Sequence, residues 1–403
     1  MATSETRPLQ GMRIAALVNN DTYRDSRVKK ECAALVEAGA DVTLVGWGSK
    51  YPGALDELPY RLVLVEPKSP PVWYRSLGRE TVFYPLRVAV NLSLRPYYKK
   101  NFASVHTPIV KALRSEHFDA IHANDFDMLE TGAYLARRMG ARLVYDSHEI
   151  FLAPGRWELA PAVQERFEHD EQRLFQDLDG FITVNPQIGD YLVSRYGSSI
   201  EPVIVYNGST HAVPEAQPAH TPLRVFFLGI FQPFYHFSRL IPQLTRFRGR
   251  MELTLQGYGG EEDAIREAIS ASQTEDFIRI LPPVDTFSII DASKNHDVGL
   301  INLEAGNLNQ VMASPNKFFD YLSAGLAVVA PLQLEFVQSI IEQTGAGSCY
   351  DQQKPEDILP VLDHLIGNPT EVSAMKRNAL ATAPHFTWDI QKRKLVELYS
   401  SLR

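Results

Sequence analysis

The sequence contains little cysteine, no excess of basic residues and no long hydrophobic run. Its 403 residues include two cysteines, Cys32 and Cys349, too few for a disulfide framework and typical of a reducing compartment. Forty Lys and Arg against 48 Asp and Glu give a net charge of −8, which argues against a nucleic-acid-binding surface. No apolar run reaches the roughly 18 residues of a membrane span, and the N-terminal segment lacks a signal peptide's apolar stretch. We therefore expect a cytoplasmic protein.

Short apolar strands alternate with helical stretches along most of the chain. Predicted strands at 12–18 and 41–45 flank a predicted helix at 26–38, which is the pattern of a parallel βαβ unit. Further strands are predicted at 118–122, 142–145, 180–184 and 202–205. The alternation restarts with strands at 223–228, 251–256, 277–281, 297–301 and 327–330. The sequence therefore predicts an α/β protein with two Rossmann-like, doubly wound parallel-sheet domains.

A proline-rich segment separates the two series of strands. Residues 209–222 (STHAVPEAQPAHTP) contain three prolines and almost no large apolar side chain, which is typical of a linker. We accordingly predict an N-terminal domain at 1–208, a linker at 209–222 and a second domain at 223–385. Ligands of such sheets bind beyond the carboxyl ends of the strands, so the loops after strands are where chemistry is expected.

The most informative segment is 314–329, SPNKFFDYLSAGLAVV. It predicts a loop, a helix at about 316–324 that ends at Gly325, and a strand. Lys317 beside a helix N-terminus favours an anion, because the free amides and the helix dipole attract negative charge. Asp320, three residues later on the same face, is suited to accept hydrogen bonds from a sugar hydroxyl. An amphipathic helix with a solvated lysine is the other interpretation, and the residues alone leave both open.

This segment resembles the donor-binding segment of family 4 glycosyltransferases with the GT-B fold, in a subgroup with an SPNK pattern. Segments at 25–28, 144–151 (VYDSHEIF), 205–209 (VYNGS) and 255–260 (LQGYGG) occur in the family's order. The closing stretch 386–399 resembles the family's terminal helix. The resemblance implies a GT-B fold with a cleft between its two domains, and a helix at 386–403 that returns to the N-terminal domain.

The resemblance implies particular donor-side residues. The acidic residue of the family's helix holds the donor ribose, here Asp320, and the histidine of the DSHE segment lies near the reaction centre, here His148. Together with Lys317 these are the implied catalytic residues. The glycine run after the second domain's second strand has a simple turn as its other interpretation. The implied donor-binding set is Gly257, Gly259, Gly260, His236, Asn309, Ser314, Pro315, Asn316, Lys317 and Asp320.

An acceptor-side set is implied for the first domain. The segment HANDFD at 122–127 resembles the family's strand-end motif, although an aspartate at the end of a strand also commonly caps the next helix. Arg27 on the first turn of its helix has a solvated surface position as its alternative. The implied residues are Asp21, Asp25, Arg27, Asp125, Asp146 and Glu149.

Two departures from the family pattern bear on activity. Many members carry a glutamate eight positions before the acidic residue of the helix, where this sequence has Met312. Members also commonly have an Arg/Lys pair after the second domain's first strand, whereas residues 229–239 (GIFQPFYHFSR) contain no lysine or arginine before Arg239. His236 compensates only in part, because histidine is near neutral at cytoplasmic pH. Lys317 is then the main charge expected on the diphosphate.

Residues 68–100 interrupt the alternation with seven basic residues, one glutamate and six interleaved aromatics. This composition indicates a contact with anionic lipid or with a phosphorylated acceptor, while packing beneath a long loop is the alternative. No His, Cys or Asp group has metal-ligand spacing, so neither a metal nor another cofactor is expected.

The function expected from the resemblance is transfer of a sugar from a nucleotide diphosphate donor to a hydroxyl acceptor, with retention of configuration. The acceptor would be a sugar, a lipid-linked compound or a small molecule, in glycan, polysaccharide or glycoconjugate biosynthesis. We expect a cytoplasmic location with peripheral contact to the inner face of the membrane through 68–100. Two alternatives remain open, namely a catalytically degenerate nucleotide-sugar-binding subunit and a GT-B nucleotide-sugar epimerase.

Overall fold

The chain forms two compact units. The computed structural model describes residues 7–23, 25–48, 58–66, 105–153, 161–285 and 288–403. One unit comprises Met1–Val205 with Lys392–Arg403, and the other comprises Tyr206–Gln391. The basic, aromatic stretch at 68–100 lies outside the described residues. Among the helices that are described, none is long and apolar enough to cross a membrane.

The first unit is built on a seven-stranded sheet in the order β3-β2-β1-β4-β5-β6-β7, and all neighbouring strands are parallel. This order begins at β1 and extends outward in both directions, which is the doubly wound arrangement. The strands are β1 (Arg13–Asp21), β2 (Asp41–Trp47), β3 (Arg61–Leu64), β4 (Ala120–Asn124), β5 (Arg142–Ser147), β6 (Gly180–Thr183) and β7 (Val203–Ile204).

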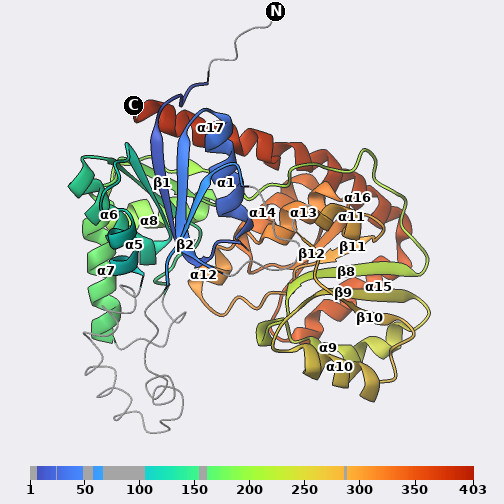
Figure 1. Ribbon diagram of the computed structural model, residues 1–403. Helices are drawn as coiled ribbons and strands as arrows, with labels where there is room; N and C mark the ends of the chain where they lie inside the picture. The colour runs from blue at the N-terminus through green and yellow to red at the C-terminus, as the bar shows by residue number, and fades with distance from the viewer. Residues whose placement is uncertain (1–6, 24, 49–57, 67–104, 154–160, 286–287) are drawn as a thin grey trace, which may run out of the picture. The chain divides into compact units, whose positions relative to one another are not determined.

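Helices between these strands complete the first unit (Figure 1). Every residue of β4 is buried, as expected for a parallel strand with helices over both faces of its sheet. Gly140 ends one helix in the left-handed conformation, and Asp25 caps another by accepting from the Val28 amide at 3.0 Å. The helices are α1 (Ser26–Glu37), α5 (His106–Ala112), α6 (Phe126–Met139), α7 (Pro161–Phe175) and α8 (Pro186–Tyr196).

The second unit has a six-stranded parallel sheet in the order β10-β9-β8-β11-β12-β13. In Figure 1 the strands β8, β9 and β10 run side by side, with α9 (Phe237–Leu244) and α10 (Glu262–Ala271) next to one another. The strands are β8 (Leu223–Ile230), β9 (Met251–Tyr258), β10 (Ile278–Leu281), β11 (Val298–Leu300), β12 (Ala327–Pro331) and β13 (Gly347–Tyr350).

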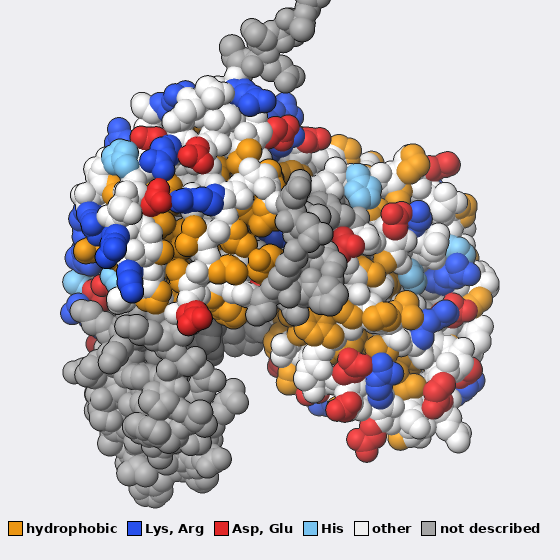
Figure 2. Space-filling view, in the orientation of Figure 1, with side chains coloured by type: hydrophobic (Ala, Val, Ile, Leu, Met, Phe, Trp, Pro, Cys, Tyr) orange, Lys and Arg blue, Asp and Glu red, His pale blue; other side chains and the backbone are white. Residues whose placement is uncertain are grey.

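Two hydrophobic clusters form the core of the second unit. One contains Phe227, Leu253 and Val298 from three neighbouring strands, and the other is rich in aromatic rings, including Phe318 and Phe319. On the face shown in Figure 2, acidic and basic side chains are interspersed over this unit. Its remaining helices are α11 (Ile289–Ser293), α12 (Leu308–Val311), α13 (Asn316–Ser323), α14 (Glu335–Thr344), α15 (Leu359–Gly367) and α16 (Pro369–Thr382).

The expected fold class, two doubly wound parallel-sheet domains, is confirmed. Two strands, β3 and β13, were not predicted. Their sequences RLVL and GSCY are only partly buried and sit at or near a sheet edge, so they lack the continuous apolar run of a central strand.

The segment at 209–222 differs from the linker that its composition predicts. It belongs to the second unit, where the Val213 amide donates to Ser323 O at 2.9 Å and the His220 amide donates to the Asp297 carboxylate at 3.1 Å. The last helix, α17 (Trp388–Ser401), contributes its residues from Lys392 onward to the first unit. There the Tyr399 hydroxyl lies 2.7 Å from His122 Nδ1.

Candidate functional site

A pocket of about 590 Å³ opens in the second unit beyond the carboxyl ends of β8 and β9. The N-terminus of α13 borders it, so free backbone amides and three polar side chains of one helix face the same space as the strand ends. The lining residues are Leu228, Gly229, Ile230, Gln232, Phe234, Tyr235, Gly257, Tyr258, Pro283, Val284, Ile289, Pro315, Asn316, Lys317 and Asp320.

Two glycines keep the strand ends open to this pocket. Gly257 has φ 155°, and a Cβ there would lie 1.8 Å from Gly229 O, so no larger residue fits. A Cβ on Gly229 would lie 3.1 Å from Lys317 Nζ. Of the predicted glycine run only Gly257 lines the pocket. Gly259 packs against Phe231 instead, and Gly260 faces open space.

Lys317 is buried, with only 9% of the residue exposed. Its Nζ lies 3.8 Å from the centre of the Phe227 ring and 4.5 Å from that of Tyr235, and it donates to Tyr235 Oη at 3.3 Å. Burial lowers the pKa of Lys317 to about 7. The alternative interpretation of Lys317 as a solvated lysine is therefore wrong.

Asp320 lies one turn after Lys317 on α13 and lines the same pocket. The Ser209 hydroxyl donates to Asp320 Oδ1 at 2.7 Å, which orients the carboxylate. Ser209 is itself nearly buried, and its carbonyl accepts from the Trp388 amide at 3.0 Å. The spacing of Lys317 and Asp320 along a helix thus brings both side chains to one pocket, as the sequence predicts.

Only some of the other predicted donor-side residues line the pocket. Pro315 and Asn316 line the pocket, whereas Asn309 and Ser314 do not. His236 Nε2 lies 2.8 Å from Glu304 Oε2, outside the lining.

Arg239 also lies outside the lining, because its guanidinium pairs with Glu356 at 2.7 Å. Lys317 is therefore the only lysine or arginine of the pocket lining in the described ranges.

Sequence reasoning missed one wall of the pocket, whose side chains are apolar or aromatic except for Gln232. Gln232, Phe234 and Tyr235 follow β8, and Tyr258 ends β9. Their common signal is position, because each lies at or just after the carboxyl end of a strand, where open α/β sheets bind ligands. The remaining residues of this wall are Pro283, Val284 and Ile289.

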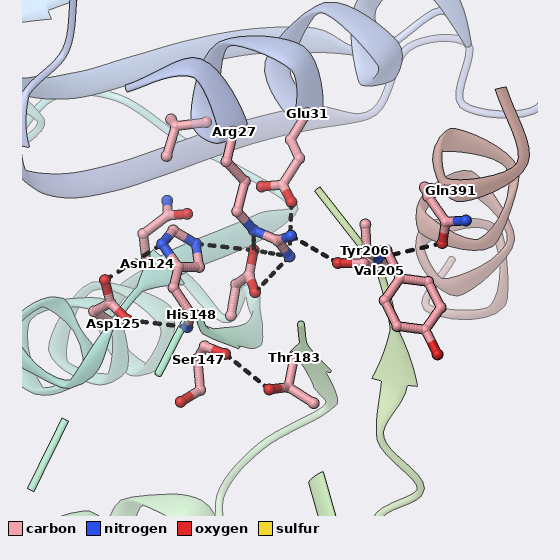
Figure 3. A network of polar contacts seen from close by, with 12 residues as sticks. Arg27, Glu31, Asn124, Asp125, Ser147, His148, Thr183, Val205, Tyr206 and Gln391 are labelled. Carbon is pink, nitrogen blue, oxygen red and sulfur yellow. Dashed lines mark hydrogen bonds and ion pairs between the residues drawn. The ribbon is translucent and has the colours of Figure 1, made fainter. Parts of the chain in front are cut away.

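A buried charge cluster lies at the carboxyl ends of β4 and β5 in the first unit (Figure 3). Arg27 is only 4% exposed and binds the Asp146 carboxylate through Nε at 3.2 Å and Nη2 at 3.0 Å. Its Nη1 donates to Val205 O at 2.7 Å, and its Nη2 lies 3.0 Å from Glu31 Oε1. Arg27 is thus engaged by buried groups and is not a solvated surface residue.

His148 bridges two carboxylates in this cluster. Its Nδ1 lies 3.3 Å from Asp125 Oδ2 and its Nε2 lies 3.3 Å from Asp146 Oδ2. Burial opposes the charge, but the two carboxylates raise the pKa of His148 to about 10. Arg27 and His148 also hold the pKa of Asp146 well below its usual range, against the effect of burial. Both ring nitrogens of a protonated His148 therefore face carboxylates.

Asp125 holds His148 and does not cap the helix that follows it. It stands at the N-terminus of α6 with φ 59°, and its side chain makes no capping hydrogen bond. Its Oδ1 instead accepts from the His148 amide at 3.0 Å. Burial raises the pKa of Asp125 to about 6, although the charge of His148 opposes this shift. The capping interpretation of Asp125 is therefore wrong.

The same cluster contains a group with the geometry of metal ligands. Glu31, His122 and Asp146 offer ligand atoms within 4.8 Å of one another, although they are far apart in the sequence. The Arg27 guanidinium lies 3.0 Å from both carboxylates and supplies the compensating positive charge. These residues therefore form an ion-pair cluster and give no argument for a metal.

Three predicted acceptor-side residues remain, namely Asp21, Asp25 and Glu149, and the negative charge of Glu149 helps to raise the pKa of Asp125. Asp21 accepts from the Tyr23 amide at 3.1 Å, and Asp25 caps α1. Glu149 directly follows His148 in sequence, and its carbonyl accepts from the Ser147 hydroxyl at 2.8 Å.

Asp127, which sequence reasoning missed, is hydrogen-bonded by Asn19 Nδ2 at 2.8 Å. Burial, with the charge of Asp125, raises the pKa of Asp127 to about 7. Its signal in the sequence was the second aspartate of HANDFD.

Comparisons with known proteins agree with this geometry. A model of Glycosyltransferase Family 4 matches residues 26–211. The chain has the GT-B fold, and residues 26–211 resemble family 4 glycosyltransferases. The resemblance of its sequence motifs to this family is thereby confirmed. No curated protein matches the chain.

Solved structures share the fold of the chain over nearly its whole length. Sucrose-phosphate synthase from Thermosynechococcus elongatus has a TM-score of 0.69 at 14% identity, covering 97% of this chain and 99% of the other. Anabaena HepE in complex with UDP and glucose has a TM-score of 0.67 at 17% identity, covering 97% and 100%. WaaG, a glycosyltransferase involved in lipopolysaccharide biosynthesis, has a TM-score of 0.63 at 12% identity, covering 95% and 98%.

Proposed function

We propose that this protein is a glycosyltransferase that moves a sugar from a nucleoside diphosphate sugar to an acceptor hydroxyl, with retention of configuration. The observation that carries the proposal is the placement of Lys317 and Asp320 on one helix, facing a pocket of about 590 Å³ beyond the strand ends. The HepE structure, with UDP and glucose bound on the same fold, supports the class of donor.

Each part of the pocket has a task in this reaction. Gly229 and Gly257 remove side chains from the strand ends, so the backbone can approach the diphosphate. Lys317 and the free amides of α13 stabilise the negative charge that grows on the departing diphosphate. Asp320, oriented by Ser209, accepts hydrogen bonds from the ribose hydroxyls. The aromatic ring of Tyr258 and the apolar side chain of Ile289 provide a surface for the nucleobase.

The chemistry needs no protein nucleophile. The bond from the anomeric carbon to the diphosphate oxygen breaks, the acceptor oxygen bonds to that carbon, and the acceptor proton passes to the departing diphosphate. His148 is poorly suited to act as a base, because both its ring nitrogens face carboxylates. Its role in the proposal is to place a fixed positive charge at the carboxyl ends of β4 and β5, in the unit that we assign to the acceptor.

The acceptor and the setting are also part of the proposal. We propose a hydroxyl of a sugar, a lipid-linked compound or a small molecule as acceptor, in glycan or glycoconjugate biosynthesis. The proposed location is cytoplasmic with peripheral membrane contact, and the proposed reaction needs no metal. Lys317 supplies the cation at the pocket, which supports a metal-free reaction.

Donor hydrolysis tests this function without knowledge of the acceptor. Nucleotide sugars with uracil, guanine, adenine and thymine bases would be incubated with the protein, and free nucleoside diphosphate measured. We expect release from at least one donor, and a loss of about 100-fold or more in Lys317→Ala and Asp320→Ala. Lys294→Ala, which removes an exposed lysine paired with Asp291, is the control. Full activity of Lys317→Ala would reject its role at the diphosphate.

A nucleotide-sugar-binding subunit without transferase activity is the second candidate. Two observations favour it: Met312 replaces the family's glutamate, and Arg239 pairs with Glu356 outside the pocket. Such a subunit would bind a nucleotide sugar and release no nucleoside diphosphate with any acceptor. Release of nucleoside diphosphate distinguishes transfer from this candidate, and also from an epimerase, which keeps the donor intact.

A further inference from the structure

The second unit contains two buried lysines with opposite environments. Lys376 Nζ lies 2.8 Å from Asp297 Oδ1 and donates to His296 O at 2.9 Å, so its charge is matched within the protein. Lys317 is similarly buried, but its polar contact is the neutral Tyr235 hydroxyl. Within the part of the chain that the structure describes, Lys317 has no carboxylate partner.

The groups around Lys317 do not supply the missing negative charge. Tyr235 stays neutral because burial raises its pKa to about 12. Phe227 and Gly229 on β8 carry no charge, and Tyr258 of β9 lies in the pocket lining. The acidic residue of the same helix that faces the pocket is Asp320, whose Oδ1 accepts from Ser209. The neighbouring loops carry His236 and Glu304, which pair with each other.

The aromatic rings of Phe227 and Tyr235 contact the Lys317 amine but do not accept its hydrogen bonds or neutralise its charge. Ring faces attract a cation, but they accept no hydrogen bonds of ordinary strength. Among the residues that the structure describes, Tyr235 Oη accepts one ammonium proton, and the other two have no acceptor. Burial of an unpaired ammonium is costly, and the group therefore gives up its proton more readily than a solvated lysine does. Lys317 has a pKa of about 7 in the pocket without a ligand.

We propose that the pocket binds its anionic ligand together with a proton, which Lys317 takes up as the ligand's diphosphate arrives. This inference rests on the proposed function for the identity of the anion. A diphosphate at Nζ supplies both the negative charge and the acceptor oxygens that are missing around Nζ among the described residues. The ammonium therefore becomes the stable form. The amine is then charged while the diphosphate is bound.

The proposal has a consequence for affinity. Linkage requires that a ligand which brings a proton binds more weakly as that proton becomes scarce. Above about pH 7 the affinity for a nucleotide sugar should fall by about tenfold for each pH unit, and below about pH 6 it should level off.

Titration calorimetry in buffers of different ionisation enthalpy measures the proton uptake directly. The probes are UDP-glucose, GDP-mannose, ADP-glucose and dTDP-glucose, chosen because their phosphates are diesters that do not titrate near neutrality. A free nucleoside diphosphate is unsuitable as a probe, because its terminal phosphate has a pKa of about 6 and would itself exchange protons in this range. For a donor that binds, we expect uptake of about 0.9 proton at pH 8 and about 0.1 at pH 6.

Two variants test whether Lys317 is the group that takes up the proton. Lys317→Arg keeps a positive charge that does not titrate, so uptake at pH 8 should vanish and the pH dependence of binding should flatten. Lys294→Arg alters an exposed lysine of the same unit that is paired with Asp291, and uptake should stay at the wild-type value.

The outcomes separate this inference from the proposed function. Binding of a nucleotide sugar to the wild type with no uptake at pH 8 would overturn the inference and leave the proposed function standing. Uptake that persists in Lys317→Arg would also overturn it. Failure of every nucleotide sugar to bind would overturn both.

Discussion

The Ser209 hydroxyl donates a 2.7 Å hydrogen bond to Asp320 Oδ1, joining two residues that are 111 positions apart in the sequence. Both belong to the second unit, and Asp320 lines its pocket. Because Ser209 is nearly buried and its own backbone is bonded to Trp388, it positions the carboxylate without being part of the lining. Under the proposed function, this relationship makes Ser209 a positioning residue for the donor-binding carboxylate.

Replacing Ser209 should therefore weaken donor binding without abolishing catalysis. Ser209→Ala removes one hydrogen bond to a carboxylate, worth about 1–2 kcal/mol, so the Kd for the nucleotide sugar should rise roughly 5–30-fold. Ser209→Thr retains the hydroxyl and should recover part of the loss. Calorimetry of donor binding measures both. Ser339→Ala, which removes a hydroxyl bonded to Phe336 O on α14, is the control and should bind normally. Equal affinities of Ser209→Ala and the wild type would rule out this positioning role.

Gly257 and Gly260 should respond oppositely to the same substitution. Gly257→Ala places a methyl group 1.8 Å from Gly229 O at a φ of 155°, so we expect a loss of several kcal/mol in the free energy of unfolding and loss of donor binding. Gly260→Ala meets nothing within 4 Å and should change stability by less than about 0.5 kcal/mol. Denaturant unfolding and donor titration test both. Loss of donor binding in a well-folded Gly260→Ala would reinstate the broader glycine site that the sequence suggests.

Asp146 should be essential to the stability of the first unit. Asp146→Asn would leave Arg27 and His148 without their shared buried carboxylate, and we expect a loss of about 3–5 kcal/mol in the free energy of unfolding. Asp177→Asn breaks the exposed pair with Arg137 and should cost less than about 1 kcal/mol. Chemical denaturation provides the comparison, and similar losses in the two variants would contradict a central role for the cluster.

The stabilising effect of His148 should depend on pH in a defined direction. Its pKa is raised from 6.5 to about 10 in the folded protein, so its contribution is fully present below about pH 6.5 and is lost as the pH rises through 10. The difference in unfolding free energy between the wild type and His148→Gln should thus shrink by a few kcal/mol from pH 6 to pH 10. Denaturant curves at pH 6, 8 and 10 measure it, and parallel profiles would show that His148 is not the charged bridge described above.

Much of the second unit could be predicted from local sequence. Lys317 and Asp320 stand three residues apart, and any helix over this segment brings both side chains to one face. The alternation of apolar strands and helices likewise predicted the parallel sheets, because the strands of such a sheet are buried on both faces and read as apolar runs. The sequence correctly predicted Gly257 as a pocket residue. It could not distinguish Gly257 from Gly260, which is the same residue type in a different environment.

The protonation and pairing of the site groups were decided by tertiary structure alone. Arg27, Asp146 and Val205 are brought together from α1, β5 and the residue after β7, and no local pattern encodes that meeting. The choice of Asp125 to hold His148 and not to cap α6 depends on the backbone angle at one residue.

Lys317 shows most clearly which properties the sequence determines and which the tertiary structure determines. Its place at the start of a helix follows from the sequence, whereas its burial against Phe227 and Tyr235 with no carboxylate partner among the described residues follows from the packing of β8 and the loop after it. The reason is physical: helix periodicity acts over a few residues, but the energy of a charge depends on every group that surrounds it in space.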